Sequence, residues 1–268
     1  MNNEYPTGQG AAHLDQTLLA EIATTASTAP FLMIAVSGAH LYGFASSDSD
    51  IDLRGTHLLP LTKVLGLDAP ILTLDHTWHT KGLEIDLVSH DLAKFLTLLL
   101  RQNGNYLEQL FSPLVIVQTP RIDELRHLVR NGTIARHAYH AYAGYARDQW
   151  RMWRKEAVMG AGHIKPLLYA YRVSLTGLHL LQTGEVIANL PWLASAYAMP
   201  ELTSLIDLKV AEKTSVPLDV DVHDKALQLL QDALQLAYEK SSLPQEPTNR
   251  AALNDFLVQV RLTGGVDV

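Results

Sequence analysis

The chain contains no cysteine among its 268 residues. Disulfides, thiol nucleophiles and cysteine-based zinc sites are therefore excluded, and the composition suits a reducing compartment such as the cytoplasm. The sequence also lacks an apolar run of the roughly 20 residues that a membrane-spanning helix needs. Its first residues lack the basic and apolar segments of a signal peptide. We therefore expect a cytoplasmic protein without a membrane span.

Three common catalytic motifs are also missing. The sequence contains no G-x-G-x-x-G, no Walker A motif and no G-x-S-x-G, so nothing indicates a dinucleotide-binding fold, a P-loop enzyme or an α/β-hydrolase. Histidines are plentiful, and the pairs His76/His79 and His137/His140 have usable metal-ligand spacing. Neither pair has an acidic residue or a third histidine clearly placed beside it, so histidine metal sites are not predicted.

Positive charge is scarce overall but concentrated in one segment. The formal net charge is −7, which argues against a broad surface for nucleic acid. Residues 119–160 nevertheless hold eight basic and four acidic residues, a net of +4, which leaves −11 elsewhere. Within this segment Arg147, Arg151 and Arg154 alternate with Trp150 and Trp153. Such a mixture is typical of single-stranded nucleic-acid binding, although tryptophans in the core with solvated arginines are an equal alternative.

The order of predicted elements indicates an α+β protein with two domains. Residues 1–118 read as a small mixed sheet with helices, and residues 119–268 show helical patterns only. Asp91 is a plausible N-cap for a helix over residues 92–102. The predicted strands cover residues 32–36, a segment carrying Asp50 and Asp52, 71–78 and 83–88. Further helices are predicted at 11–27, 121–130, 133–159, 163–183, 202–212, 222–240 and 249–262.

Asp50 and Asp52 form the strongest chemical signal. Alternate side chains of a strand share a face, so the two carboxylates are predicted to stand side by side. Such a pair is costly unless a cation neutralises it, and oxygen ligands favour Mg²⁺. The alternative is a solvated turn, because the serine-rich residues 46–49 have a loop-like composition.

The segment FLMIAVSGAHLYGFASSDSDIDLRGT resembles the signature of the DNA polymerase beta-like nucleotidyltransferase superfamily: an apolar strand, a glycine turn, a loop and Asp-apolar-Asp. Together with DLVSHDLAKFLTLLLRQNGNYLEQLF and GHIKPLLYAYRVSLTGLHLLQTGEV, it is similar to the RNA-repair-pathway DNA polymerase beta family over residues 31–191. The resemblance implies transfer of a nucleoside monophosphate from an NTP to a hydroxyl with Mg²⁺ or Mn²⁺. The implied acceptor is an RNA 3′ end, such as that of a damaged tRNA.

The resemblance also implies site residues. A third carboxylate falls on Asp86, with Glu84 as a competing choice on the same strand face. Gly38 permits close approach of the backbone to a phosphate, while Ala39 replaces the serine common in the superfamily and so removes a hydroxyl. The nucleotide-binding residues expected are Ser37, Gly38, Ala39, His40, Tyr42, Ser49, Lys165 and Arg172. For His40 and Tyr42 the alternative is packing in the core or a place on the surface. Lys165 and Arg172 share a helical face, for which a solvated basic stripe is the alternative.

Other acceptors are alternatives to RNA, because the fold and metal site are shared by enzymes acting on RNA, proteins and small molecules. AMP transfer to a protein hydroxyl, as in antitoxin-like relatives, is a second hypothesis. A catalytically silent nucleotide-binding scaffold is a third, for which Ala39 is the only hint in the sequence.

Overall fold

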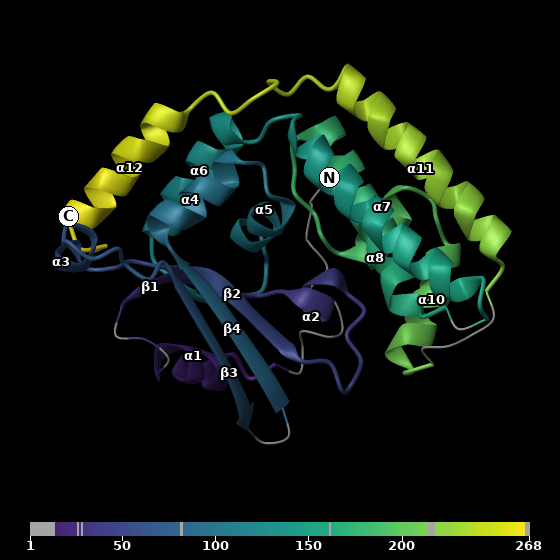
Figure 1. Cartoon of the computed structure of the whole chain (residues 1–268), viewed down its shortest axis with the longest axis horizontal. Coiled ribbons are helices and arrows are strands. Elements are labelled where there is room, and N and C mark those ends of the chain that lie inside the picture. The colour runs from purple at the N-terminus through teal and green to yellow at the C-terminus, as the bar shows by residue number, and fades with distance from the viewer. Residues whose placement is uncertain are drawn as a thin grey trace. The chain divides into compact units, whose positions relative to one another are not determined.

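The chain folds into two compact units, shown in a computed structural model (Figure 1) that describes residues 14–265 except 26, 28, 81–82, 161 and 214–217. We call residues 14–38, 50–135 and 246–265 the sheet unit, and residues 39–49 and 136–245 the helical unit. Within the described residues the chain passes between the units four times, whereas the division predicted at residue 118 passes once.

The sheet unit is built on five strands in the order β3-β4-β2-β1-β5. Strands β2 and β4 pair in parallel, and the other neighbours pair antiparallel. The mixed sheet and the α+β class are thus confirmed. Strand β1 is buried at every position, as its uniformly apolar sequence requires in the centre of a sheet. The strands are β1 Phe31–Val36, β2 Ile51–His57, β3 Thr73–Thr80, β4 Leu83–Asp91 and β5 Val115–Gln118.

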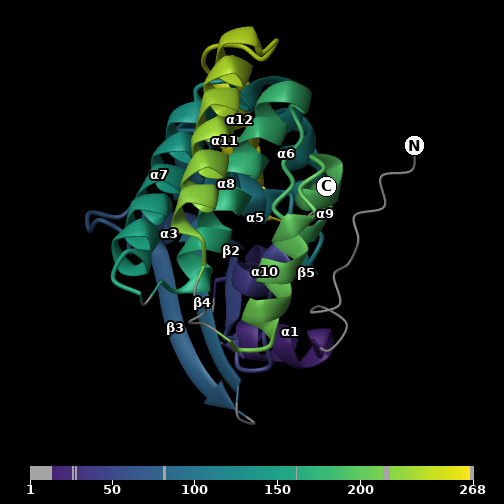
Figure 2. The same ribbon diagram turned by 90° about the vertical axis from the view of Figure 1, so that its right-hand side faces the viewer.

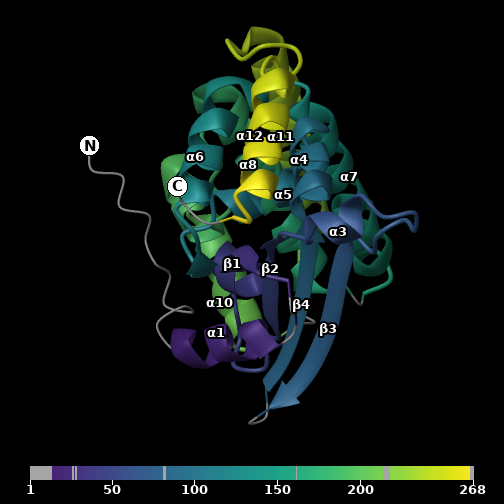
Figure 3. The ribbon, with the colours of Figure 1, turned by 90° about the vertical axis from the view of Figure 1, so that its left-hand side faces the viewer.

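Helices cover both faces of this sheet. Figures 1 and 3 show α4, α6 and α12 on one face and α1 on the other. The turn between β3 and β4, predicted around residues 80–82, lies largely outside the described residues. The helices of the unit are α1 Gln16–Thr25, α3 Leu61–Val64, α4 Leu92–Leu100, α5 Gly104–Leu110, α6 Arg121–Leu128, the π-helical turn Val129–Thr133 and α12 Arg250–Leu262.

Asp91 joins three parts of the sheet unit. As predicted, it caps α4, because its Oδ1 accepts a hydrogen bond from the backbone N–H of Ala93 at 3.0 Å. Oδ2 accepts from the backbone N–H of Leu59 at 3.1 Å. Arg261 of α12 donates to Oδ1 at 2.6 Å, and its side chain is 9% exposed against 0% for Asp91. A buried ion pair therefore ties α12 to the sheet.

The helical unit is organised around α8 (Ile164–Thr183), which is buried along most of its length. Helices α7 (Ala138–Ala157) and α11 (Val220–Lys240) run beside it (Figure 2). Gly177 permits close packing of α7 and α8, because a Cβ there would lie 2.7 Å from Cβ of Tyr142. Two further helices, α9 Leu190–Ala196 and α10 Glu201–Val210, complete the unit.

Helix α2 (Gly38–Tyr42) connects the two units along the chain. The sequence patterns did not predict α5, α9 or β5, and they placed the start of α7 too early. No described helix is both long and apolar enough to cross a membrane.

Candidate functional site

The parallel pairing of β2 and β4 brings two of the predicted carboxylates together. Asp52 lies directly opposite Asp86 in the register. The neighbouring residues Leu53, Ile85 and Leu87 are fully buried on the other face. Because side chains alternate along both strands, Asp52 and Asp86 share the face on which their oxygens remain accessible, with side-chain exposures of 31% and 30%.

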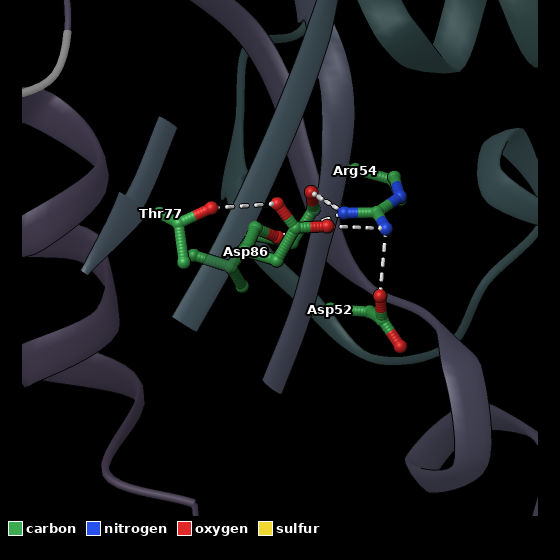
Figure 4. A network of polar contacts seen from close by, with 5 residues as sticks. Asp52, Arg54, Thr77 and Asp86 are labelled. Atoms are coloured by element: carbon green, nitrogen blue, oxygen red, sulfur yellow. Dashed lines mark hydrogen bonds and ion pairs between the residues drawn. The ribbon is translucent and has the colours of Figure 1, made fainter. Parts of the chain in front are cut away.

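Arg54 lies between these carboxylates (Figure 4). Its Nη2 donates to Oδ1 of Asp52 at 2.6 Å and to Oδ2 of Asp86 at 2.8 Å. Its Nη1 donates to the backbone oxygens of Leu53 and Asp86 at 2.9 and 2.8 Å. Thr77 of β3, opposite Asp86 in the register, donates a longer hydrogen bond of 3.4 Å to Oδ1 of Asp86. The single positive charge of the guanidinium therefore offsets part of the negative charge of the two carboxylates.

The role of Arg54 was not predicted from the sequence. Its position two residues after Asp52 placed it on the correct strand face, which was the available signal. The sequence pattern could not predict the register between β2 and β4, which brings Asp86 within reach of the same guanidinium.

The other acidic candidates lie apart from this pair. Asp50 is exposed and precedes the first residue of β2, so the strand does not include it as predicted. Glu84 lies opposite His79 on β3, with its Oε2 3.7 Å from the histidine Nδ1. Register with Asp52 therefore favours Asp86 over Glu84 as the carboxylate that works with Asp52.

The donor atoms of Asp52 and Asp86 fit a hard divalent cation, since both present carboxylate oxygens on an accessible face. Within the part of the chain that the structure describes, no three acidic or histidine side chains gather into a metal-binding group. Asp52 and Asp86, two of the three predicted ligands, lie opposite each other in the strand register. Metal binding by Asp50 stays a prediction.

Gly38 brings the turn after β1 against Asp52. Its φ of +61° favours glycine, and a Cβ at this position would lie 1.9 Å from Oδ2 of Asp52. The backbone N–H of Ser37 also donates to the carbonyl of Asp52 at 2.8 Å. The close approach expected at Gly38 is thus made to the candidate metal ligand. Contacts of Ser37, Ala39 and His40 with a nucleotide stay predictions.

Tyr42 and Arg172 stack together inside the helical unit. The guanidinium of Arg172 is 3.9 Å from the centroid of the Tyr42 ring, and Arg172 is fully buried. Lys165, one of the first residues of α8, is instead exposed. The two cations expected to act together therefore differ in exposure: Lys165 is accessible to a phosphate from solvent, whereas Arg172 supports the aromatic ring of Tyr42.

Ser49 belongs to a loop held by an unpredicted lysine. Lys209 of α10 is 8% exposed, and its Nζ donates to the hydroxyls of Ser46 and Ser49 at 2.5 and 3.0 Å. Burial lowers the pKa of Lys209, against the opposing charge of Asp48. The pKa of Asp48 is itself lowered, mainly by the hydrogen bond from Ser46. The contact between Lys209 and this loop forms only in the tertiary structure, so no local sequence pattern could predict it.

A groove of about 500 Å³ lies between exposed residues of α7 and α11. Nε1 of Trp150 donates to Asp224 at 2.6 Å, and Arg154 pairs with the same carboxylate at 2.5 Å. Trp153 is fully buried and is therefore a core residue. The groove is lined by Arg147, Trp150, Arg151, Arg154, Asp224, Lys225 and Gln228.

Three comparisons report which known proteins and families this chain is similar to. An uncharacterized protein of Methanocaldococcus jannaschii, MJ0002, is 26% identical over 235 residues, which cover 83% of this chain and 90% of that protein. A crystal structure of a nucleotidyltransferase-like protein from Exiguobacterium sibiricum matches over 93% of this chain and 75% of that chain, with 17% identity and a TM-score of 0.32. The family model described as the RNA repair pathway DNA polymerase beta family matches residues 12–259, and the chain therefore belongs to that family.

Proposed function

We propose that this protein is a metal-dependent nucleotidyltransferase that moves a nucleoside monophosphate from an NTP to an acceptor hydroxyl and releases pyrophosphate. The observation that carries the proposal is the pair Asp52 and Asp86, placed opposite each other on parallel strands beside the Gly38 turn. Family membership supports a nucleotidyltransferase type of function.

Asp50, Asp52 and Asp86 would hold Mg²⁺ or Mn²⁺. When bound, such an ion neutralises charge on the phosphate oxygens. In the transfer, the acceptor oxygen forms a bond to the α-phosphorus, and the bond from that phosphorus to the pyrophosphate oxygen breaks. Asp86 is the proposed base that takes the hydroxyl proton, the role that the resemblance implies for the third carboxylate, and its side chain is 30% exposed.

The nucleotide is proposed to lie against the segment that follows β1. Gly38 lets the turn pack directly against Asp52, and Lys165 is exposed enough to pair with phosphate oxygens. Tyr42 is 7% exposed and packs against Arg172 and Tyr169, so its proposed role is to support the segment that follows the glycine turn. The proposed nucleotide contacts are Ser37, Gly38, Ala39, His40, Ser49 and Lys165, whereas the predicted contacts Tyr42 and Arg172 are buried and pack against each other.

The proposed acceptor is an RNA 3′ end. The family description names RNA repair, and the α7–α11 groove supplies cations beside an aromatic wall, as single-stranded RNA binding requires. Arg147, Arg151 and Arg154 are all exposed; Arg154 pairs with Asp224, and Arg151 lies 3.6 Å from Asp148. We therefore assign phosphate contact to Arg147 first, and to Arg151 and Arg154 where their ion pairs open.

The test is incubation with each α-labelled NTP, Mg²⁺ or Mn²⁺, and a mixed tRNA pool. We expect label in RNA with the unmodified protein, loss of label with Asp86→Asn, and retention of most activity with Glu84→Gln, a matched control on the same strand. Label on protein would replace the RNA acceptor with AMP transfer to a protein hydroxyl. NTP binding without any transfer would favour a silent scaffold.

A further inference from the structure

Residues 39–49 connect the glycine turn to the candidate metal ligand Asp50, and they pack as part of the helical unit. Tyr42 and Phe44 contact the ring of Tyr169 on α8, with centroid distances of 5.5 and 5.7 Å. Gly43 has φ of +82°, and a Cβ there would lie 2.6 Å from Nδ2 of Asn189. The first half of the segment is therefore fixed by close packing.

The second half of the segment is fixed by polar contacts from one end of α10. Nζ of Lys209 donates to the hydroxyls of Ser46 and Ser49. The hydroxyl of Ser47 donates to Oε1 of Glu212, just beyond the helix, at 2.7 Å. Three serines of the loop, Ser46, Ser47 and Ser49, thus gain partners from residues that are more than 150 positions away in the sequence.

Lys209 closes a turn as well as contacting it. The backbone N–H of Ser46 donates to Oγ of Ser49 at 2.9 Å, and the N–H of Ser49 donates to the carbonyl of Ser46 at 3.1 Å. The ammonium group bridges the hydroxyls at the two ends of this turn. A single peptide bond separates Ser49 from Asp50, so the turn sets the direction in which the chain enters β2.

A buried lysine is a costly way to hold a loop. Removing an ammonium from water is unfavourable unless partners replace the lost hydration, and an apolar residue at the end of α10 would avoid that penalty. Hydroxyl partners satisfy part of the ammonium here, and Asp48 supplies an opposing charge nearby. These contacts hold the hydroxyls of Ser46 and Ser49 close to the same ammonium group.

We propose that Lys209 is a positioning residue for nucleotidyl transfer: it holds the Ser46–Ser49 turn closed and thereby orients Asp50. The inference rests on the proposed function, in which Asp50 is a ligand of the metal ion. Lys209 acts through the loop, and the competing role is direct contact with a nucleotide phosphate.

The test compares Lys209→Met, Lys209→Arg and the control Lys213→Met, which alters an exposed lysine just beyond α10. In Lys209→Met we expect the amides of Ser46 and Ser49 to exchange with deuterium roughly tenfold faster, and Mn²⁺ affinity, measured by electron paramagnetic resonance, to fall roughly tenfold. Lys209→Arg should restore part of both, and Lys213→Met should change neither.

Nucleotide binding in EDTA separates the two roles of Lys209. Positioning predicts that ATP affinity without metal is unchanged in Lys209→Met. A loss of ATP affinity with adenosine affinity intact would assign Lys209 to phosphate binding and overturn the proposal, as would unchanged amide exchange or unchanged Mn²⁺ affinity. If Lys209→Met fails to fold, Ser46→Ala removes one of the two lysine contacts from the loop side; it should speed exchange of the Ser49 amide and weaken Mn²⁺ binding, and no change in either would overturn the proposal.

Failure of the proposed function leaves a different pattern. An unmodified protein that binds Mn²⁺ yet labels no acceptor would refute nucleotidyl transfer, while amide exchange and Mn²⁺ affinity would still decide the role of Lys209. A Lys209→Met protein with full transfer activity and unchanged exchange would refute the positioning role alone.

Discussion

Replacing Arg54 with methionine would remove the counter-ion that Asp52 and Asp86 share. The guanidinium makes two hydrogen bonds to carboxylates and two to backbone carbonyls. Methionine keeps much of the side-chain length but supplies no donor, so the two carboxylates would face each other without a cation. The metal-free protein should therefore be less stable, and more responsive to divalent ions, than the unmodified protein.

The magnitude follows from the exposure of the three side chains. Buried hydrogen bonds to charged groups contribute about 1.5–3 kcal/mol each, but exposures of 21–31% place these near the lower limit. We expect Arg54→Met to lower the free energy of unfolding by about 2–4 kcal/mol. For a chain of this length the melting temperature should fall by about 5–10 °C.

Thermal unfolding in EDTA and in Mg²⁺ measures both effects. If the variant binds Mg²⁺ ten times more tightly, saturating Mg²⁺ should stabilise it by about 1.4 kcal/mol more than the unmodified protein. Lysine at position 54 should give an intermediate result, since an ammonium lacks the planar fork of guanidinium. Arg101→Met, at an exposed arginine of the sheet unit, is the matched control.

The reasoning would be refuted by an Arg54→Met protein that melts with the Arg101→Met control in EDTA. It would also be refuted if Mg²⁺ raised the melting temperature of both proteins equally. Either result would mean that Arg54 does not balance the charge of the carboxylate pair.

Three further predictions concern stability and RNA binding. Arg261→Met leaves the buried carboxylate of Asp91 without its partner, and urea denaturation should show a loss of about 3–5 kcal/mol; a loss below about 1 kcal/mol would match a surface pair instead. Burial lowers the pKa of His90 from 6.5 to about 4. Between these pH values the folded protein therefore binds fewer protons than the unfolded chain, and its stability should fall as the pH drops from 6.5 to 4. His90→Asn should make the melting temperature less dependent on pH over that range. Arg147→Ala with Arg151→Ala should weaken binding of single-stranded RNA and reduce its logarithmic salt slope by about 1.4, for two lost phosphate contacts, in fluorescence anisotropy; an unchanged slope would exclude the groove.

Local sequence patterns were sufficient for features that depend on neighbours in the chain. The cap at Asp91 follows from a short polar side chain before an apolar helix, and the structure confirms it. The apolar run of β1 and the glycine at position 38 likewise predicted a buried strand and a tight turn. The α+β class followed from the order of these elements.

Features that depend on tertiary register were beyond reach of those patterns. Arg54 meets Asp86 only because β2 and β4 pair in parallel across 32 positions. Lys209 reaches Ser46 across 163 positions. Short elements were missed for a different reason: β5 has four residues, too few for alternation to distinguish it from a loop.

The buried pair of Arg261 and Asp91 also constrains the order in which the protein can assemble on the ribosome. The strands of the sheet unit and the whole helical unit are synthesised before α12, which carries Arg261. Domains generally fold as they emerge, beginning with the N-terminal part. The sheet unit gains this buried ion pair only after α12 has been synthesised, because Arg261 lies on that helix. The residues of the helical unit all precede α12, so that unit is free to fold first.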